Sequence, residues 1–359
     1  MPAGFAATDG PLAAAHDVAL LDLDGVVYVG ADAVPHAAEA LDAALAQHGL
    51  RGGFVTNNAA RPPQVVAEHL RTLGVHAHDA DVVTSAQAGA RVLIERFPAG
   101  SPVLAVGGPG VPWALAEREL RPVLTVDDDP VAVMQGFGPD VGWRELAEAT
   151  LAIGRGALWV ATNVDATIPT PRGRALGNGA LVEAVRHATG VTPIVAGKPE
   201  PPLMVESVER TSALRPLVVG DRLDTDIEGA ARAGIPSLLV LTGVTDWHDL
   251  LRAQPVHRPD YLDVDLRGLL RPAPVVTSAI EGDAVTGRCR AAEVSLVLAP
   301  PGTPGAVVPE GVAWLPGALR PGVPQQEAAD LDLDLARALL AAVWQAADAG
   351  RIVAGVVGA

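Results

Sequence analysis

Residues 17–28 have the sequence DVALLDLDGVVY, in which an apolar run meets two aspartates. Its apolar run, 18–21, ends at Asp22, and Asp24 follows two positions later, before a glycine that permits a tight turn. Such a run, bounded by polar residues, is typical of a buried parallel strand. Parallel sheets bind ligands beyond the carboxyl ends of their strands. Two carboxylates there suit a hard cation such as Mg²⁺, or a nucleophile with a general acid.

The ordinary alternative is a loop with two solvated aspartates, and two other Asp-x-Asp pairs serve as comparisons: Asp263 with Asp265, and Asp332 with Asp334. Neither pair follows a long apolar run, and neither is followed by glycine. Asp332 and Asp334 precede a predicted helix, where carboxylates complement the helix dipole. We therefore interpret both pairs as structural carboxylates and keep Asp22 with Asp24 as a candidate site.

The stretch 54–61, FVTNNAAR, again places polar residues at the end of a short apolar run. Thr56 offers a hydroxyl, and the backbone N–H groups of the turn at Asn57 and Asn58 can form a nest for an anion. The alternative is a plain turn with asparagine in left-handed geometry.

Lys198 lies in GKPE, residues 197–200, and is the single lysine among 26 basic residues. Asparagine is nearly as rare, with four in the chain, at positions 57, 58, 163 and 178. In a chain this rich in arginine, lysine is expected to persist where arginine cannot replace it. The two differ most where a compact point charge is needed, so Lys198 is a candidate anion ligand.

A fourth motif, VVGDRLDTDIEGA at 218–230, ends another buried run at Asp221. Asp224 and Asp226 open the helix predicted over 224–233. N-capping is the ordinary role of such residues, and we assign it to Asp224. Each of the four motifs is weak alone, but they form an ordered set, and three of them lie at predicted strand ends.

Strands and helices alternate along the chain, which predicts βαβ units and a parallel sheet. The turn-rich segment FPAGSP precedes a second α/β unit, and beyond residue 270 the composition changes before a strongly amphipathic helix. We predict an α/β fold with a doubly wound, parallel-sheet (Rossmann-like) core, an inserted α/β cap domain and a small C-terminal α+β domain. The predicted boundaries are 1–96 and 195–268 for the core, 97–194 for the cap and 272–359 for the C-terminal domain.

The four ordered motifs resemble those of the haloacid dehalogenase superfamily. With a large α/β cap between the second and third motifs, the chain is most similar to the NagD-like (type IIA) branch, over about residues 15 to 265. That branch includes pyridoxal phosphatases and phosphatases of phosphoglycolate or glycerol phosphate. The resemblance implies a Mg²⁺-dependent phosphomonoester hydrolase that acts through an aspartyl-phosphate.

By this resemblance, Asp22 attacks phosphorus, while Asp24 protonates the leaving alkoxide and then activates water. Asp22, the backbone carbonyl of Asp24 and Asp221 hold the Mg²⁺, and Asp226 orients Lys198 or a metal-bound water from the second shell. The acid at position 24 argues against a dehalogenase or phosphonatase. The residues expected to hold the transferring phosphoryl group are Thr56, Asn57, Asn58 and Lys198.

Residues 161–173, ATNVDATIPTPRG, resemble the substrate loop of this family. The resemblance implies that specificity in the cap comes from Asn163, Asp165, Ile168 and Pro169. Pyridoxal phosphatase has histidine where this chain has Ile168, which counts against an aromatic vitamer as substrate. The glycine-rich stretch 106–111, VGGPGV, lacks the spacing of a nucleotide loop, and we predict a turn of the cap.

The net charge of −16, from 26 basic and 42 acidic residues, argues against nucleic acid or an anionic membrane as the main partner. No apolar run reaches the roughly 18–20 residues of a membrane helix, and the N-terminal residues lack the basic start of a signal peptide. Cys289 is alone and cannot form an internal disulfide. We expect a cytoplasmic protein that binds a small phosphorylated metabolite. Homo-oligomerisation through the cap or the C-terminal domain stays open.

The overall layout also resembles actinobacterial glycerol 3-phosphate phosphatases, which join this core and cap to a region similar to GCN5-type acetyltransferases. The resemblance implies glycerol 3-phosphate as the substrate. Residues 270–359 contain no Q/R-x-x-G-x-G/A pyrophosphate loop, so a structural or oligomerisation role is favoured over acyl transfer. The alternatives are a phosphatase of phosphoglycolate, pyridoxal phosphate or nucleoside monophosphates, or a catalytically silent regulatory or binding protein.

Overall fold

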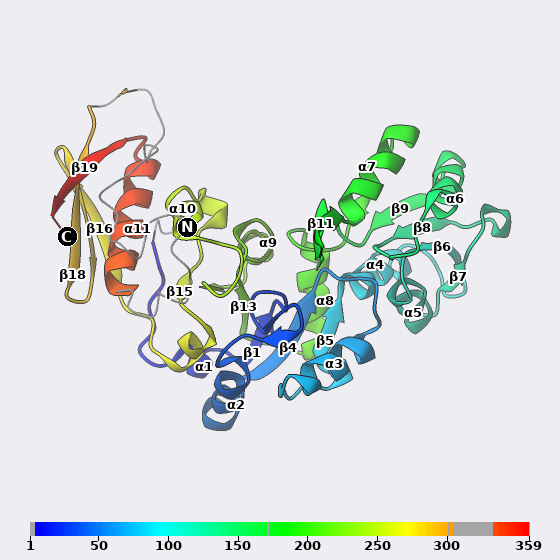
Figure 1. Ribbon diagram of the computed structural model, residues 1–359, viewed down its shortest axis with the longest axis horizontal. Coiled ribbons are helices and arrows are strands. Elements are labelled where there is room, and N and C mark those ends of the chain that lie inside the picture. Colours follow the sequence, from blue (N-terminus) through cyan, green and yellow to red (C-terminus); the bar gives the residue numbers. More distant parts are fainter. Residues whose placement is uncertain (1–3, 171, 301, 304–332, 359) are drawn as a thin grey trace. The chain divides into compact units, whose positions relative to one another are not determined.

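The computed structural model describes residues 4–170, 172–300, 302–303 and 333–358. Two compact units make up the structure, Met1–Arg51 together with Arg215–Ala359, and Gly52–Leu214. This division is coarser than the three predicted domains, whose boundaries stay predictions. The predicted α/β class is confirmed, because both units contain parallel strands accompanied by helices (Figure 1).

The first unit contains parallel strands in the order β15-β14-β13-β1. Each residue of β1, β14 and β15 is buried, as expected for a parallel sheet whose faces are both covered. The strands are β1 (Val18–Leu21), β13 (Pro216–Gly220), β14 (Ser237–Val240) and β15 (Tyr261–Asp263). The helices nearest in sequence are α1 (Leu12–Ala15), α2 (Ala37–His48), α9 (Glu228–Ala233) and α10 (Trp247–Leu251).

The C-terminal part of this unit is an antiparallel sheet, β16-β17-β18-β19, with helix α11 (Leu333–Asp348) packed against it (Figure 1). Its strands are β16 (Val276–Glu281), β17 (Ala284–Cys289), β18 (Ala292–Leu298) and β19 (Val353–Gly358). Leu339 of α11 belongs to one hydrophobic core with Leu239 and Leu262 of the parallel strands. The Trp344 indole Nε1 also donates to the Leu250 carbonyl at 2.9 Å. The predicted small α+β part is confirmed, and it shares its core with the parallel sheet.

Cys289, at the end of β17, is fully buried, and burial raises the pKa of its thiol to about 12, with the nearby Asp334 carboxylate adding to the rise. Because the thiolate is the reactive form, we expect Cys289 to react with Ellman's reagent at least about 10³-fold more slowly in the native protein than in guanidinium chloride. Stopped-flow absorbance in the two conditions measures this ratio. Fast native labelling would mean that α11 separates readily from the sheet.

The second unit contains the parallel pair β4 (Arg51–Thr56) and β5 (Val82–Thr84), with helices α3 (Pro63–Thr72), α4 (Ser85–Ile94) and α8 (Pro201–Thr211). It also contains a five-stranded parallel sheet in the order β12-β9-β8-β6-β7. Its strands are β6 (Pro102–Val106), β7 (Arg121–Val123), β8 (Ala132–Gln135), β9 (Leu158–Ala161) and β12 (Ile194–Val195). Its helices are α5 (Gly110–Glu117), α6 (Trp143–Gly154) and α7 (Asn178–Thr189).

Two local features differ from the sequence-based expectation. The segment after β9 forms an antiparallel hairpin, β10 (Thr167–Thr170) with β11 (Gly173–Leu176), where only a loop was predicted. The helix expected over 224–233 begins as a π-helical turn, Leu223–Ile227, before α9. The N–H groups of Asp226 and Ile227 both donate to the carbonyl of Arg222. The Asp226 carboxylate accepts from the N–H of Arg222, which fixes this wider turn.

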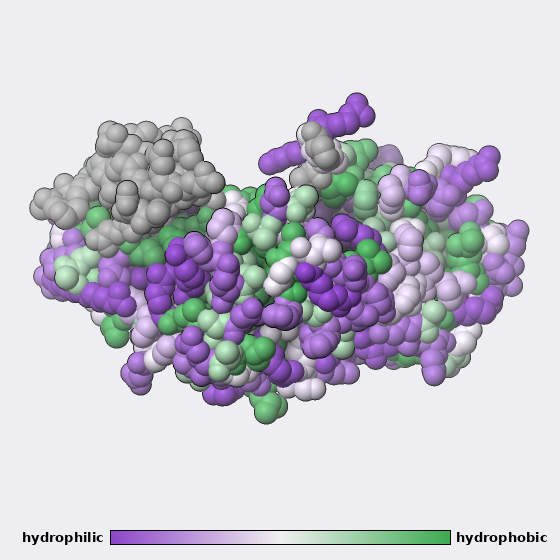
Figure 2. Space-filling model, turned by 60° about the horizontal axis from the view of Figure 1, so that its bottom comes forward, coloured by the Kyte–Doolittle hydropathy of each residue, from purple (hydrophilic) through white to green (hydrophobic). Residues whose placement is uncertain are grey.

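The face drawn in Figure 2 is mostly hydrophilic, with apolar side chains in scattered groups among its described residues. Such scattered exposure is ordinary for a protein surface. In the part of the chain that the structure describes, no helix combines the length and the apolar character needed to cross a bilayer.

Candidate active site

Three aspartates meet where two neighbouring parallel strands end. Asp22 follows β1 directly, and Asp221 follows β13, its neighbour in register, with the N–H of Asp22 bonded to the carbonyl of Val219 at 2.8 Å. The π-turn after β13 adds Asp226. One carboxylate oxygen from each of the three lies within 4.8 Å of the others. Asp221 and Asp226 are buried and Asp22 is half-buried.

Two glycines approach the Asp221 carboxylate so closely that neither position has room for a side chain. A Cβ at Gly25 would lie 2.6 Å from its Oδ2, and a Cβ at Gly243 would overlap the carboxylate. The N–H of Val244 donates to the same Oδ2 at 2.6 Å, while the Thr242 hydroxyl donates to the carbonyl of Gly25 at 2.5 Å. The loop after β14 therefore fixes Asp221 and the Asp-x-Asp-Gly turn together.

Asp24 does not belong to this cluster of three carboxylates and is an exposed residue. The turn that carries it is closed by the Gly25 N–H, which donates to the carbonyl of Tyr28 at 2.8 Å. An exposed carboxylate can exchange protons with a leaving group or with water, so this placement suits an acid and base. The predicted metal contact of Asp24 runs through its backbone carbonyl and stays a prediction.

Asp224, for which N-capping was expected, pairs instead with Arg222, whose Nη2 and Nε donate at 2.8 and 3.0 Å. Burial raises the pKa of Asp224, but the hydrogen bonds from Arg222 outweigh it and hold the pKa below its usual value. Asp224 therefore forms a structural ion pair with Arg222.

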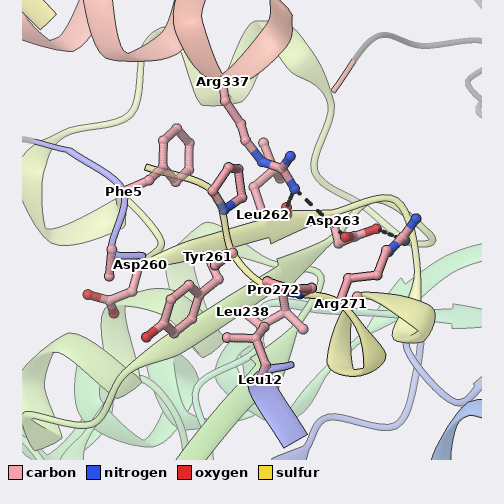
Figure 3. A pocket seen from close by; sticks show the side chains of 14 residues that line it. Phe5, Leu12, Leu238, Asp260, Tyr261, Leu262, Asp263, Arg271, Pro272 and Arg337 are labelled. Carbon is pink, nitrogen blue, oxygen red and sulfur yellow. Dashed lines mark hydrogen bonds and ion pairs between the residues drawn. The ribbon is translucent and has the colours of Figure 1, made fainter. Parts of the chain in front are cut away.

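Both aspartates of the comparison pair, Asp263 and Asp265, form ion pairs with arginines. Asp263 lies between Arg271 and Arg337, as Figure 3 shows, and Asp265 binds Arg267 at 2.6 Å. Burial raises the pKa of Asp263, although both arginines act in the opposite direction. The interpretation of this pair as structural agrees with these contacts, while Asp332 lies outside the described residues.

The cavity drawn in Figure 3 lies between the N-terminal segment, the end of β15 and α11. Its volume is about 20 Å³, which is room for about one water molecule. It is too small for a phosphorylated metabolite, so the candidate site is the aspartate cluster and not this cavity.

In the second unit, the residues predicted to bind phosphate lie together. Thr56 ends β4, is buried, and its hydroxyl accepts from the N–H of Asn58 at 3.1 Å. The Asn58 side chain in turn accepts from the N–H of Ala60 at 2.8 Å. Lys198 is only 3% exposed, and its Nζ donates to the carbonyl of Val55 at 3.4 Å. The structure therefore brings the single lysine of the chain to the end of β4.

Asn57 connects this group to the predicted substrate loop. Its Oδ1 accepts from the N–H of Lys198 at 2.8 Å, and its Nδ2 donates to the Lys198 carbonyl at 3.1 Å. The same Nδ2 donates to Asp165 at 3.3 Å. The Asn57 carbonyl accepts from Asn163 Nδ2 at 2.8 Å and from the Ser85 hydroxyl at 2.6 Å.

Of the four cap residues predicted to set specificity, two belong to the hydrogen-bonded group around Asn57 and two lie in strand β10. Asn163 is buried and Asp165 is half-buried, both within the hydrogen bonds just described. Ile168 lies in β10 and is half-buried. Pro169 lies in the same strand, but its side chain falls outside the described part of the structure. Their roles in specificity stay predictions.

Two residues of this group were not predicted. Asn178, the first residue of α7, is buried, and its Nδ2 donates to the carbonyls of Asn163 at 2.7 Å and Gln135 at 3.3 Å. A Cβ at Gly197 would lie 2.6 Å from Asn57 Oδ1 and 2.5 Å from the Thr162 carbonyl. The sequence shows that asparagine is rare, which is the one signal that could have singled out Asn178. Its position as the first residue of a helix gives no indication of its two carbonyl partners.

The three clustered aspartates favour a divalent cation. Carboxylates this close, two of them buried, repel one another unless a positive charge neutralises them. Hard oxygen ligands and the position beyond parallel strands suit Mg²⁺. The donor set therefore fits the metal that the sequence implied.

Comparison with known proteins places these residues in a family. Family models match residues 19–121, for a haloacid dehalogenase-like hydrolase, and residues 195–269, for a HAD-hydrolase-like protein. The two matches contain all four sequence motifs and flank the region between them.

Named relatives are phosphatases. A D-glycerol 3-phosphate phosphatase of Mycobacterium tuberculosis is 50% identical over 268 residues, 75% of each chain. An acid sugar phosphatase of Staphylococcus aureus is 39% identical over 233 residues, 64% of this chain and 88% of the relative. The crystal structure of the M. tuberculosis glycerol phosphate phosphatase in complex with magnesium superposes with a TM-score of 0.76 at 42% identity. That superposition covers 94% of this chain and 92% of the other, so it extends into the C-terminal part.

Proposed function

The chain belongs to the haloacid dehalogenase-like hydrolases and is a phosphatase, and we propose that it hydrolyses glycerol 3-phosphate to glycerol and phosphate. The observation that supports this substrate is the 50% identity to a D-glycerol 3-phosphate phosphatase over three quarters of both chains. The acid sugar phosphatase is the less similar of the two relatives, at 39% identity. The similarity therefore supports a sugar phosphate as substrate less strongly than glycerol 3-phosphate.

In the proposed reaction, a carboxylate oxygen of Asp22 attacks phosphorus in line, and the bond from phosphorus to the ester oxygen breaks. Asp24, an exposed residue, gives its proton to the leaving glycerol oxygen. It then takes a proton from the water that attacks the aspartyl-phosphate. Phosphate leaves, and Asp22 and Asp24 return to their starting states.

The cofactor is Mg²⁺, which the clustered oxygens of Asp22, Asp221 and Asp226 fit. When bound, it neutralises the charge between the attacking carboxylate and the phosphate ester. Asp221 is held for this task by the N–H of Val244 and by the close glycines. We propose that Asp226 supports the site through its bond to the Arg222 backbone as well as through its charge.

The phosphoryl oxygens need donors and a positive charge, and we assign these to Thr56, Asn58 and Lys198. Lys198 and Thr56 are buried, which strengthens their interaction with a desolvated anion. Ile168 and Pro169 are proposed to lie over the leaving group, and Asn163 and Asp165 are the other two residues proposed to set specificity in the cap.

We also propose a cytoplasmic location, which suits an enzyme of small phosphorylated metabolites whose single cysteine is buried as a thiol. Oligomerisation through the cap or the C-terminal part is tested by light scattering after size exclusion. Acetyl-coenzyme A binding by the full-length chain tests the acyl-transfer alternative, because the similarity of residues 272–359 to acetyltransferases stays a prediction.

The substrate is tested by phosphate release from a panel of esters, with Mg²⁺ and after EDTA treatment. The panel contains glycerol 3-phosphate, phosphoglycolate, pyridoxal phosphate, sugar phosphates and nucleoside monophosphates. We expect the highest kcat/KM for glycerol 3-phosphate and a loss of about 10³-fold or more when the metal is removed, because the clustered carboxylates then repel the substrate. A tenfold preference for another ester would reject glycerol 3-phosphate while leaving the phosphatase intact.

A further inference from the structure

All four asparagines and the single lysine of the chain lie in one region of the second unit. Three of the asparagines form a continuous relay. Asn178 Nδ2 donates to the Asn163 carbonyl at 2.7 Å, Asn163 Nδ2 donates to the Asn57 carbonyl at 2.8 Å, and Asn57 holds both the N–H and the carbonyl of Lys198. The fourth, Asn58, lies in the turn beside Thr56.

Asn57 uses all the donors of its carboxamide within the protein. An asparagine side chain has two N–H donors and one carbonyl acceptor. Both donors point to protein oxygens, those of Lys198 and Asp165, and the acceptor receives the Lys198 N–H. The missing side chain of Gly197 is what allows this approach. The Asn57 side chain therefore has no donor left for a phosphoryl oxygen.

We infer that Asn57 is a positioning residue for Lys198, and that the relay from Asn178 through Asn163 couples Lys198 to the substrate loop. This inference rests on the proposed phosphatase site and changes the expected role of the Asn57 side chain from phosphate ligand to support. Asp165 joins the same connection, because its N–H donates to Asn163 Oδ1 at 3.2 Å and its carboxylate accepts from Asn57. A shift of residues 163–165 therefore moves the hydrogen bonds that hold the lysine backbone.

Each position of the relay requires a carboxamide. Asn178 donates to two backbone carbonyls, and Asn57 donates to a carbonyl and a carboxylate while accepting an N–H. An aspartate of the same shape keeps the acceptor but loses the donors, and it places a negative charge against those oxygens. Aspartate substitutions thus break the relay without opening a cavity.

The test is a double-mutant cycle with Asn57→Asp and Lys198→Gln, measured as kcat and KM for whichever phosphate ester the wild type hydrolyses best. We expect Asn57→Asp alone to lower kcat about 10²-fold, the cost of a misplaced catalytic group. In the Lys198→Gln background it should cost less than about threefold more, because residues acting through one group are not additive. A full, additive loss in that background would show that Asn57 binds the substrate itself and would overturn the inference.

Asn178→Asp tests the other end of the relay, and it replaces Asn57→Asp in the test if that variant does not fold. We expect a loss of about tenfold in kcat that again disappears in the Lys198→Gln background, with an unchanged KM. Gln64→Glu, an exposed amide-to-acid change on α3, is the matched control and should leave kcat within about twofold. An unchanged kcat in a folded Asn178→Asp protein would reject the relay. Preference for a different ester would reject the proposed substrate alone, since the cycle does not depend on which ester is used.

Discussion

An Asp22→Asn variant is expected to lose phosphatase activity by about 10⁴-fold or more, the scale seen when a nucleophile is removed. Asparagine has the same shape, and the backbone N–H of residue 22 still bonds to the carbonyl of Val219. The amide cannot attack phosphorus, and it removes one of the three charges that fit the metal. Phosphate release at saturating Mg²⁺ measures the loss.

Asp42→Asn, an exposed change of the same atoms on α2, is the control and should leave kcat within about twofold. Thermal unfolding of both variants separates a chemical loss from a folding defect. If folded Asp22→Asn protein keeps more than a tenth of the wild-type rate, the nucleophile must be another residue.

Gly243→Ala is expected to weaken Mg²⁺ binding by about 10²-fold, the upper range for changes around a metal ligand. A Cβ at this position would overlap the Asp221 carboxylate, which also accepts from the N–H of Val244. The carboxylate must move, and the oxygen that it offers to the metal moves with it. The Mg²⁺ concentration that gives half-maximal activity measures the effect.

Gly154→Ala is the matched control, because a Cβ there meets nothing within 4 Å and the residue ends helix α6. Its Mg²⁺ requirement should be that of the wild type. Partial recovery of Gly243→Ala at high Mg²⁺ is expected, since the other two carboxylates remain. An unchanged Mg²⁺ requirement would show that Asp221 does not hold the metal.

The sequence predicted the strand ends because parallel strands leave a strong local signal. The buried run 18–21 and the run before Asp221 are continuous apolar segments that stop at carboxylates, and their adjacency follows from parallel pairing. The four motifs then indicated the chemistry, and the family match confirmed the class.

Other features depend on contacts between distant residues and leave no local signal. Strand β10 contains Pro169, which is more typical of a loop than of a strand, and the register of the hairpin β10–β11, Thr167 with Leu176, is set only in the folded chain. The π-turn depends on Asp226 bonding back to Arg222. Asn178 looks like an ordinary first residue of a helix until its two carbonyl partners are known.

The buried position of Lys198 also determines how this protein reacts with reagents that modify amines. The chain has no other lysine, and this one is 3% exposed. Succinimidyl dyes, aldehyde crosslinkers and acetylating reagents therefore find no exposed ε-amino group to react with. Slow modification of the Lys198 ε-amino group would consequently measure how often the proposed phosphate-binding region opens, because no other lysine contributes to the signal.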